Sequence, residues 1–162
     1  MNDSKQLVSD KTAYDVLDSC RHLVSLIHIA SRATEKNLGL SAAQLYVLRK
    51  LQQSDHHLSL SDIAAITHTH QSSVSVVVKK LIEKGLVASK SAKDDARRLE
   101  LKVTAKARKL LESSPEAVQD RLIRAIQTLR QDDAEHLQKI LGLVLGAAEA
   151  RVEPAPLFFE ED

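Results

Sequence analysis

One short segment, residues 70–84, carries the side chains best suited to contact another molecule. Its apolar residues recur at helical spacing and predict a buried stripe made of Val74, Val77, Val78, Leu81 and Ile82. The opposite face carries Ser72, Ser73, Ser75, Val76, Lys79 and Lys80. Short polar side chains let a helix approach base edges closely, and lysines neutralise phosphates. The pattern therefore predicts a helix that enters a groove of double-stranded DNA.

Two kinds of DNA contact are expected from this region. Gln71 can pair bidentately with adenine, and the serines that follow it are further candidates for base edges. Lys79 and Lys80 are expected to bind phosphates. Further along the chain, Arg97 is expected to enter the minor groove, and the anionic Asp95 to hold a neighbouring arginine in place. The candidate DNA-binding residues are His70, Gln71, Ser72, Ser73, Ser75, Lys79, Lys80, Lys93, Arg97 and Arg98.

Two short helices joined by a tight turn are expected to position this face. Residues 60–66 have apolar side chains at 60, 63, 64 and 66, which predicts a helix with one buried face. Ser59 or Ser61 can cap it, and the polar connection that follows offers Thr69 or His70 as the cap of the second helix. A short helix, a tight turn and a second helix with polar N-terminal residues form a helix-turn-helix.

A β-hairpin is expected directly after the second helix. Gly85 stands where a glycine that ends a helix belongs. Residues 86–91 can form one strand, and residues 98–103 alternate apolar and charged side chains, which is the period of a half-buried strand. The polar segment 92–97 would form the hairpin tip. A hairpin in this position is a wing, so the whole segment predicts a winged helix-turn-helix.

These segments together resemble the DNA-binding core of the MarR family of bacterial transcription regulators. The matching motifs are Leu40-Ser41-x-x-Gln44, Asp62-Ile63-Ala64, Gln71-Ser72-Ser73-Val74-Ser75, Lys80-Leu81-x-x-Lys84-Gly85-Leu86-Val87, and Asp95-x-Arg97 placed before Thr104. The similarity extends over about residues 12–150. The family often has arginine where Ser89 stands, a difference expected to change a contact near the wing base. It usually has glycine where Ala107 stands, a difference that merely favours the helix. The resemblance implies a DNA-binding regulator, most often a repressor, with a triangular two-fold dimer.

Further helices are expected on both sides of the winged core. The apolar patterns predict helices over residues 12–35 and over 42–53, the second capped by Ser41. Residues 105–112 are expected to continue into 115–129, with Pro115 either kinking that helix or opening a new one. A last helix starting at Asp132 or Asp133 and reaching about residue 150 is apolar on more than one side. It therefore needs a partner, most economically a second copy of the chain.

The expected fold class is mostly α with a small β-hairpin wing, in which a winged helix-turn-helix core is flanked by N- and C-terminal dimerisation helices. Residues 41–109 would form the DNA-binding region. Residues 11–40 and 110–150 would form the dimerisation region, and residues 1–10 and the acidic tail 151–162 would be flexible. A homodimer of this kind binds two half-sites about one helical turn apart, so its operator is expected to be pseudo-palindromic.

The charge distribution supports DNA as the partner, although the net charge of +1 alone would not. Residues 70–110 hold eleven Lys and Arg against four Asp and Glu, a local excess of +7 that leaves −6 for the rest. Cys20 is the single cysteine, which excludes an intramolecular disulfide. The sequence has no membrane-spanning apolar run and no signal peptide, so a cytoplasmic location without membrane association is expected. It has no phosphate loop, nucleophile motif or cofactor motif, so neither an enzyme nor a cofactor is expected.

The family resemblance implies a small aromatic or acidic effector that binds between the dimer helices and the winged core. The residues that could line such a cleft are His22, His28, Arg32, Tyr46 and Arg49, although a surface or packing role also fits each of them. The histidines lack metal-ligand spacing, so no metal site is expected, while a role as a pH switch stays open. Cys20 is expected to be a buried thiol. The alternative functions are a redox- or metal-responsive regulator of the same fold and a winged-helix protein-interaction module.

Overall fold

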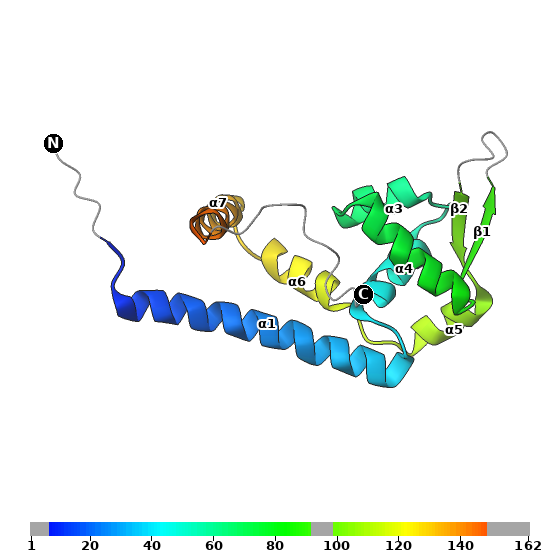
Figure 1. Cartoon of the computed structure of the whole chain (residues 1–162), viewed down its shortest axis with the longest axis horizontal. Helices are drawn as coiled ribbons and strands as arrows, with labels where there is room; N and C mark the ends of the chain where they lie inside the picture. Colours follow the sequence, from blue (N-terminus) through cyan, green and yellow to red (C-terminus); the bar gives the residue numbers. More distant parts are fainter. Residues whose placement is uncertain (1–6, 92–98, 149–162) are drawn as a thin grey trace.

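The computed structural model describes residues 7–91 and 99–148, and it confirms a mostly helical fold with a two-stranded antiparallel hairpin. The elements are α1 (Asp10–Leu38), α2 (Ala42–Gln53), α3 (Leu60–Thr67), α4 (Gln71–Glu83), β1 (Val87–Ser91), β2 (Leu99–Val103), α5 (Ala105–Glu112), α6 (Val118–Gln127) and α7 (Gln131–Ala147). Elements α2 to α5 and the hairpin gather at one end, and α1 runs away from them as a long rod beside α6 and α7 (Figure 1). None of the described helices combines the length and the apolar character needed to cross a membrane.

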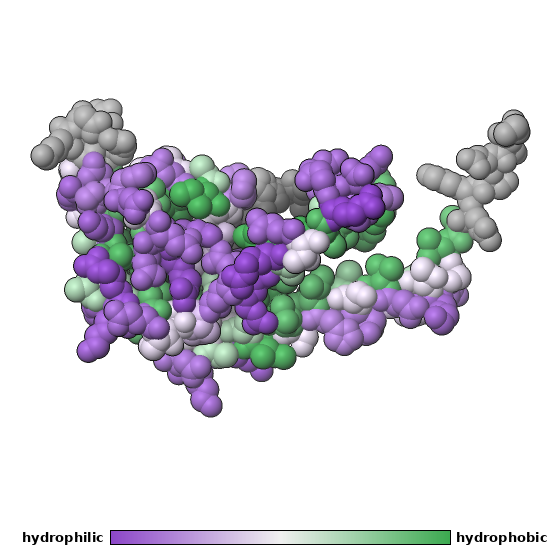
Figure 2. Space-filling model, turned by 180° about the vertical axis from the view of Figure 1, so that it is seen from behind, coloured by the Kyte–Doolittle hydropathy of each residue, from purple (hydrophilic) through white to green (hydrophobic). Residues whose placement is uncertain are grey.

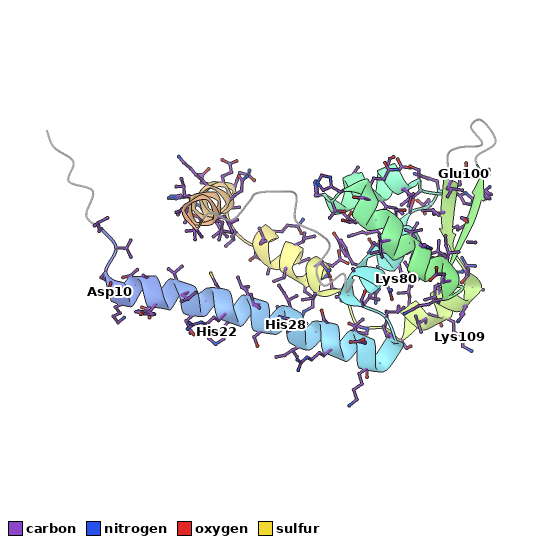
Figure 3. All side chains as sticks on the ribbon, viewed as in Figure 1. Asp10, His22, His28, Lys80, Glu100 and Lys109 are labelled. Carbon is purple, nitrogen blue, oxygen red and sulfur yellow. The ribbon has the colours of Figure 1, made fainter. Side chains whose placement is uncertain are left out.

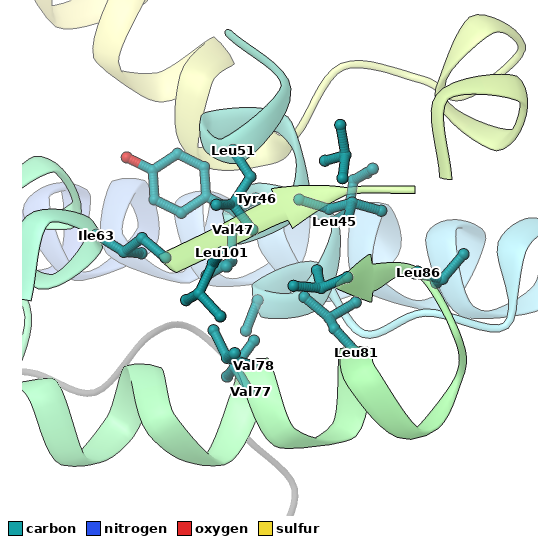
Figure 4. Close-up of a cluster of buried hydrophobic side chains, with 14 of the residues drawn as sticks. Leu45, Tyr46, Val47, Leu51, Ile63, Val77, Val78, Leu81, Leu86 and Leu101 are labelled. Carbon is teal, nitrogen blue, oxygen red and sulfur yellow. The ribbon is translucent and has the colours of Figure 1, made fainter. Parts of the chain in front are cut away.

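Helix α2 lies at the centre of the winged core, where α3, α4, α5, α6 and β2 all contact it. Every residue from Ala42 to Leu48 is buried, so this part of the helix is enclosed on all sides. Val47 and Leu48 meet Ile63 of α3, Val78 and Leu81 of α4 and Leu101 of β2 in one continuous cluster (Figure 4). This cluster fixes the positions of the two helices of the helix-turn-helix.

Side-chain caps fix where the helices of the core begin. Ser41 and Ser59 each accept a hydrogen bond from the third residue of the following helix, whose side chain bonds back to the cap. These contacts confirm that Ser41 caps α2, and they show that Ser59, not Ser61, caps α3. Helix α4 starts after His70, which makes no side-chain cap. Gly85 has a φ of 69°, the left-handed conformation that favours glycine, and it ends the helix as expected.

The hairpin pairs β1 with β2 in one antiparallel register, from Val87 opposite Val103 to Ser91 opposite Leu99. Leu58 adds an isolated bridge to Leu101, which ties the segment before α3 to the sheet. The wing is therefore anchored to the core by its base. Its tip, residues 92–98, lies outside the described residues.

The break between α5 and α6 differs from both sequence-based alternatives. Residues 113–117 are non-helical and α6 begins at Val118, so Pro115 neither kinks a continuous helix nor opens a new one. Proline lacks an N–H and disfavours a helical conformation in the residue before it. The guanidinium of Arg49 stabilises this segment, because its Nη2 donates to the carbonyl oxygens of Ser114 and Pro115 at 2.8 Å and 2.9 Å.

The other predicted boundaries shift by a few residues. Helix α1 is longer than expected, and Asp10, which was assigned to a flexible terminus, lies within it behind the cap residue Ser9. Helix α7 ends at Ala147, and residues 1–6 and 149–162, including the acidic tail, lie outside the described part of the chain.

Several side chains predicted to be buried are exposed in the single chain. Ile66 and Ile82 lie at the edges of their helices, and Leu99 lies at the end of β2 toward the wing tip. Cys20 is also exposed, so the expectation of a buried thiol is wrong for the isolated chain. The reason is that residues 7–25 are all exposed in the single chain, and Ile27 is the first residue along α1 that is buried.

Two leucines of β2 provide a test of where the core lies. Leu101 is 0% exposed and Leu99 is 40% exposed. We expect Leu101→Ala to lower the free energy of unfolding by about 2–5 kcal/mol, because it leaves a cavity beside α2. Leu99→Ala should cost less than about 1 kcal/mol. Urea denaturation at one fixed protein concentration measures both, and equal losses would contradict this placement of the core.

Candidate nucleic-acid interface

Helix α4 divides into a buried face and an outward stripe. Val74, Val77, Val78 and Leu81 are buried against the core. The residues opposite them are exposed and follow one another at helical spacing; they are Ser72, Ser75, Val76, Lys79 and Glu83. The outward stripe, defined by these five residues, therefore contains two serines and one lysine that the sequence predicted as DNA contacts.

The remaining candidates on α4 lie beside the outward stripe. Ser73 and Lys80 are half-buried, and Lys80 lines a small hollow with Glu35 and Lys84 (Lys80 is labelled in Figure 3). Lys80 thus lies at one edge of the helix, whereas Lys79 is exposed on the outward stripe.

Gln71 and His70 stand at the exposed N-terminal end of α4. Ser61 Oγ of α3 donates to Gln71 Oε1 at 3.1 Å, which orients the amide. The amide nitrogen of Gln71 can still donate to adenine N7, and its oxygen has a second lone pair for the adenine amine. The contact between Ser61 and Gln71 was not foreseen, because residues ten positions apart on different helices give no periodic signal.

Hydrogen bonds at both ends hold α4 in place. At the N-terminal turn, the backbone N–H of Thr69 donates to the carbonyl of Ala64 at 3.0 Å. At the other end, Lys84 Nζ donates to the carbonyl of Gly39 at 2.6 Å and to Gln44 Oε1 at 3.0 Å. Helix α4 is therefore fixed to α3 and to the corner between α1 and α2, and it presents the outward stripe on a rigid support.

The wing adds cations beside α4. Lys90 of β1 pairs with Glu100, its cross-strand neighbour on β2, at 3.1 Å. The side chains of Lys93, Asp95, Arg97 and Arg98 lie outside the described residues, so their contacts stay predictions.

The five residues predicted for an effector cleft do not come together. His28 and Arg32 line an open hollow along α1 with Cys20, while His22 lies on α1 within 3.4 Å of Asp18. Arg49 instead faces a second hollow beside α6 and binds the segment before that helix.

Tyr46 lies apart from both groups because it is buried in α2. Burial raises the pKa of its hydroxyl above the ordinary value, while the nearby Lys50 ammonium opposes this shift. Lys50 lies over the Tyr46 ring at 5.0 Å and pairs with Asp120 of α6 at 2.6 Å, both side chains being largely buried. These contacts are structural, because they join the winged core to α6. Within residues 7–91 and 99–148, no three His, Cys, Asp or Glu side chains are grouped so that they could hold a metal ion.

Comparison with known proteins shows what this core is similar to. Residues 38–98 match the model of the MarR family. The winged helix-turn-helix segment of this chain is thus similar to the MarR family, over a match of 61 of its 162 residues. This is the family of winged helix-turn-helix transcription regulators that the sequence motifs resemble. No curated protein matches the chain in sequence.

Solved structures with the same fold cover nearly the whole chain. Sco3205, a MarR family transcriptional regulator from Streptomyces coelicolor solved in complex with DNA, has a TM-score of 0.63 at 17% identity and covers 96% of this chain and 99% of its own. AbsC, a MarR family regulator from the same organism, has a TM-score of 0.61 at 19% identity and covers 91% and 100%. The transcriptional regulator BldR from Sulfolobus solfataricus has a TM-score of 0.56 at 21% identity and covers 85% and 99%. The shared fold therefore includes the long helices as well as the winged core.

The outward stripe makes Lys79 the cation of α4 best placed for DNA phosphates. We expect Lys79→Ala to weaken binding to all duplexes alike, and to reduce the slope of log affinity against log salt by about 0.9 per protomer. Lys11→Ala is the matched control, because it removes the same charge at the far end of α1, where Lys11 pairs with the exposed Asp15. Titrations of both variants at several salt concentrations measure the slope. An unchanged slope for Lys79→Ala would contradict this assignment.

Proposed function

We propose that the chain is a sequence-specific DNA-binding transcription regulator that acts as a homodimer and represses by occupying a pseudo-palindromic operator. The observation that carries the proposal is the outward stripe of α4, where hydroxyls and a lysine are exposed on a helix that the core holds rigidly. Such a surface matches base edges and phosphates of a major groove. The structural similarity to a regulator solved with DNA supports the same conclusion.

The apolar surfaces of the long helices support a dimer. No residue of α7 is buried in the single chain, although Leu137, Ile140, Leu141 and Val144 all lie on it. Apolar side chains of α7 and of α1 face an open gap between the two helices (Figure 2). Apolar helix faces of this extent indicate an interface, and a second copy of the chain would cover them with the same residues.

Two-fold symmetry would let two copies of the outward stripe contact enough base pairs to recognise a specific DNA sequence. One recognition helix reaches only a few base pairs, whereas two helices related by a two-fold axis reach half-sites about one helical turn apart. We propose that Arg97 adds a contact in the flanking minor groove, where A·T-rich sequences concentrate negative potential. Gln71, Ser72 and Ser73 would then supply contacts near the centre of each half-site.

We also propose a small aromatic or acidic effector, and the hollow along α1 supports this part of the proposal. His28 and Arg32 stand there beside the apolar side chains of Leu17, Val24 and Ile29. A guanidinium and an imidazole next to an apolar wall suit a molecule with an apolar body and an anionic group. In the proposed dimer, a ligand bound in this hollow would lie between α1 of one protomer and the helices of its partner. It would change the separation of the two recognition helices, so that they no longer fit the two half-sites and the operator is released.

The direct test of the proposal is selection of bound DNA from random duplexes with the purified chain. The expected result is an enriched inverted repeat whose half-sites lie about one helical turn apart. Enrichment of a single unrepeated site would overturn the dimeric part of the proposal. Retention of DNA without any enriched sequence, or no retention at all, would overturn sequence-specific regulation.

The dimer has its own test in α7. Light scattering of the parent chain at micromolar concentration should give about twice the 17.9 kDa chain mass. Leu141→Asp should shift the protein toward monomer and lower its stability, because the dimer would have to bury an unpaired charge. Lys139→Asp, which places the same residue two positions away on the polar side of α7, should leave the dimer intact. A parent that is a stable helical monomer would contradict the proposed assembly.

A further inference from the structure

Val76 is an apolar residue in the middle of the polar outward stripe. It is 48% exposed, whereas Val77 and Val78, the next two residues, are each 3% exposed. Ser72 and Ser75 precede it on the stripe and Lys79 follows it. Its isopropyl group is therefore presented to the surroundings between hydroxyls and a cation.

Val76 is not part of the buried core, although it also lines the small hollow beside Lys80. Its side chain is absent from the buried cluster that fixes α4 against α2, and that cluster uses Val74, Val77, Val78 and Leu81. A β-branched residue is also a poorer helix former than alanine at an exposed position. An exposed apolar group that contributes neither core packing nor helix propensity fits a contact made only when another molecule is bound.

The chemistry around Val76 indicates which group that contact would be. Phosphates next to Lys79 would place the outward stripe in the major groove, where base pairs present nitrogen and oxygen donors and acceptors. The C5-methyl group of thymine is the apolar group that a standard base pair shows in this groove. An isopropyl group can bury that methyl group, whereas it would leave an amine or carbonyl of another base unpaired.

We propose that Val76 is a specificity-determining residue that packs against the C5-methyl group of a thymine in each half-site. The inference rests on the proposed DNA-binding function and names one base that it selects. Ser72 and Ser75 flank the contact and can bond to polar edges of the neighbouring bases. Cytosine, which has a hydrogen in place of the methyl group, is disfavoured at this position because it offers Val76 less apolar surface.

Deoxyuridine tests the inference, because it differs from thymidine only by the missing methyl group and keeps the same hydrogen-bonding edge. Each thymine of a selected duplex is replaced in turn by deoxyuridine, and the affinity of the full-length chain is measured by titration. One symmetric pair of replacements should weaken the parent about fourfold per methyl group, and about fifteenfold when both half-sites are changed. Val76→Ala should bind the thymine and deoxyuridine duplexes with nearly equal affinity.

Two controls separate this result from loss of folding and from failure of the proposed function. Ile82→Ala also truncates an exposed aliphatic side chain of α4, but at the edge of the helix, and it should keep the preference for thymine. Circular dichroism and binding to an unrelated duplex should be the same for Val76→Ala and the parent. A parent that ignores every replacement, or a Val76→Ala variant that discriminates as the parent does, would overturn the role of Val76 while sequence-specific binding stands. Absence of any sequence preference in the parent would overturn the proposed function itself.

Discussion

The packing of α4 against α2 is the interaction on which the rest of the site depends. Three consecutive valines, Val76 to Val78, are mediocre helix formers, so intrinsic propensity does little to keep this segment helical. Burial of Val74, Val77, Val78 and Leu81 against a central helix that is itself almost wholly buried supplies the stabilisation. The same packing fixes the rotation of α4, and rotation decides which side chains form the outward stripe.

A second set of contacts connects the winged core to the helices that would form the dimer. Lys50 of α2 pairs with Asp120 of α6, and Arg49 holds the non-helical segment that precedes α6. A largely buried ion pair adds little net stability, but removing one partner leaves an uncompensated charge, so the pair favours one orientation of the two parts. In a dimer, that orientation would set the distance between the two recognition helices. The α2–α6 contact is therefore where a change at the dimer interface would reach the DNA-binding surface.

The sequence predicted the features that depend on local periodicity and on capping chemistry. The buried stripe of α4, the capping residues Ser41 and Ser59, the left-handed Gly85 and the strand pairing all have local signals, and the structure contains them. The errors concern residues at the edges of elements. Ile66, Ile82 and Leu99 fit the apolar period, but neighbouring elements end before they cover them.

Other features could not be predicted because they depend on contacts between distant segments. The non-helical segment around Pro115 is held by Arg49, more than sixty positions away, and the exposure of Cys20 follows from how far α1 extends beyond the core. Of the proposed effector residues, His28 and Arg32 line one hollow and Arg49 lines another for the same reason, since spacing along the chain does not tell which side of α2 faces α6. The wing tip, with Arg97, is a prediction from sequence and charge alone.

The central claim is that the outward stripe of α4 lies in the major groove while the wing reaches the minor groove. Methylation by dimethyl sulfate distinguishes the two, because it modifies guanine N7 in the major groove and adenine N3 in the minor groove. On a selected duplex with guanines in both half-sites, the bound protein should protect guanine N7 in two patches about one helical turn apart, and adenine N3 in the sequences that flank them. Guanine N7 atoms that stay fully reactive within the half-sites of the bound complex would contradict the account.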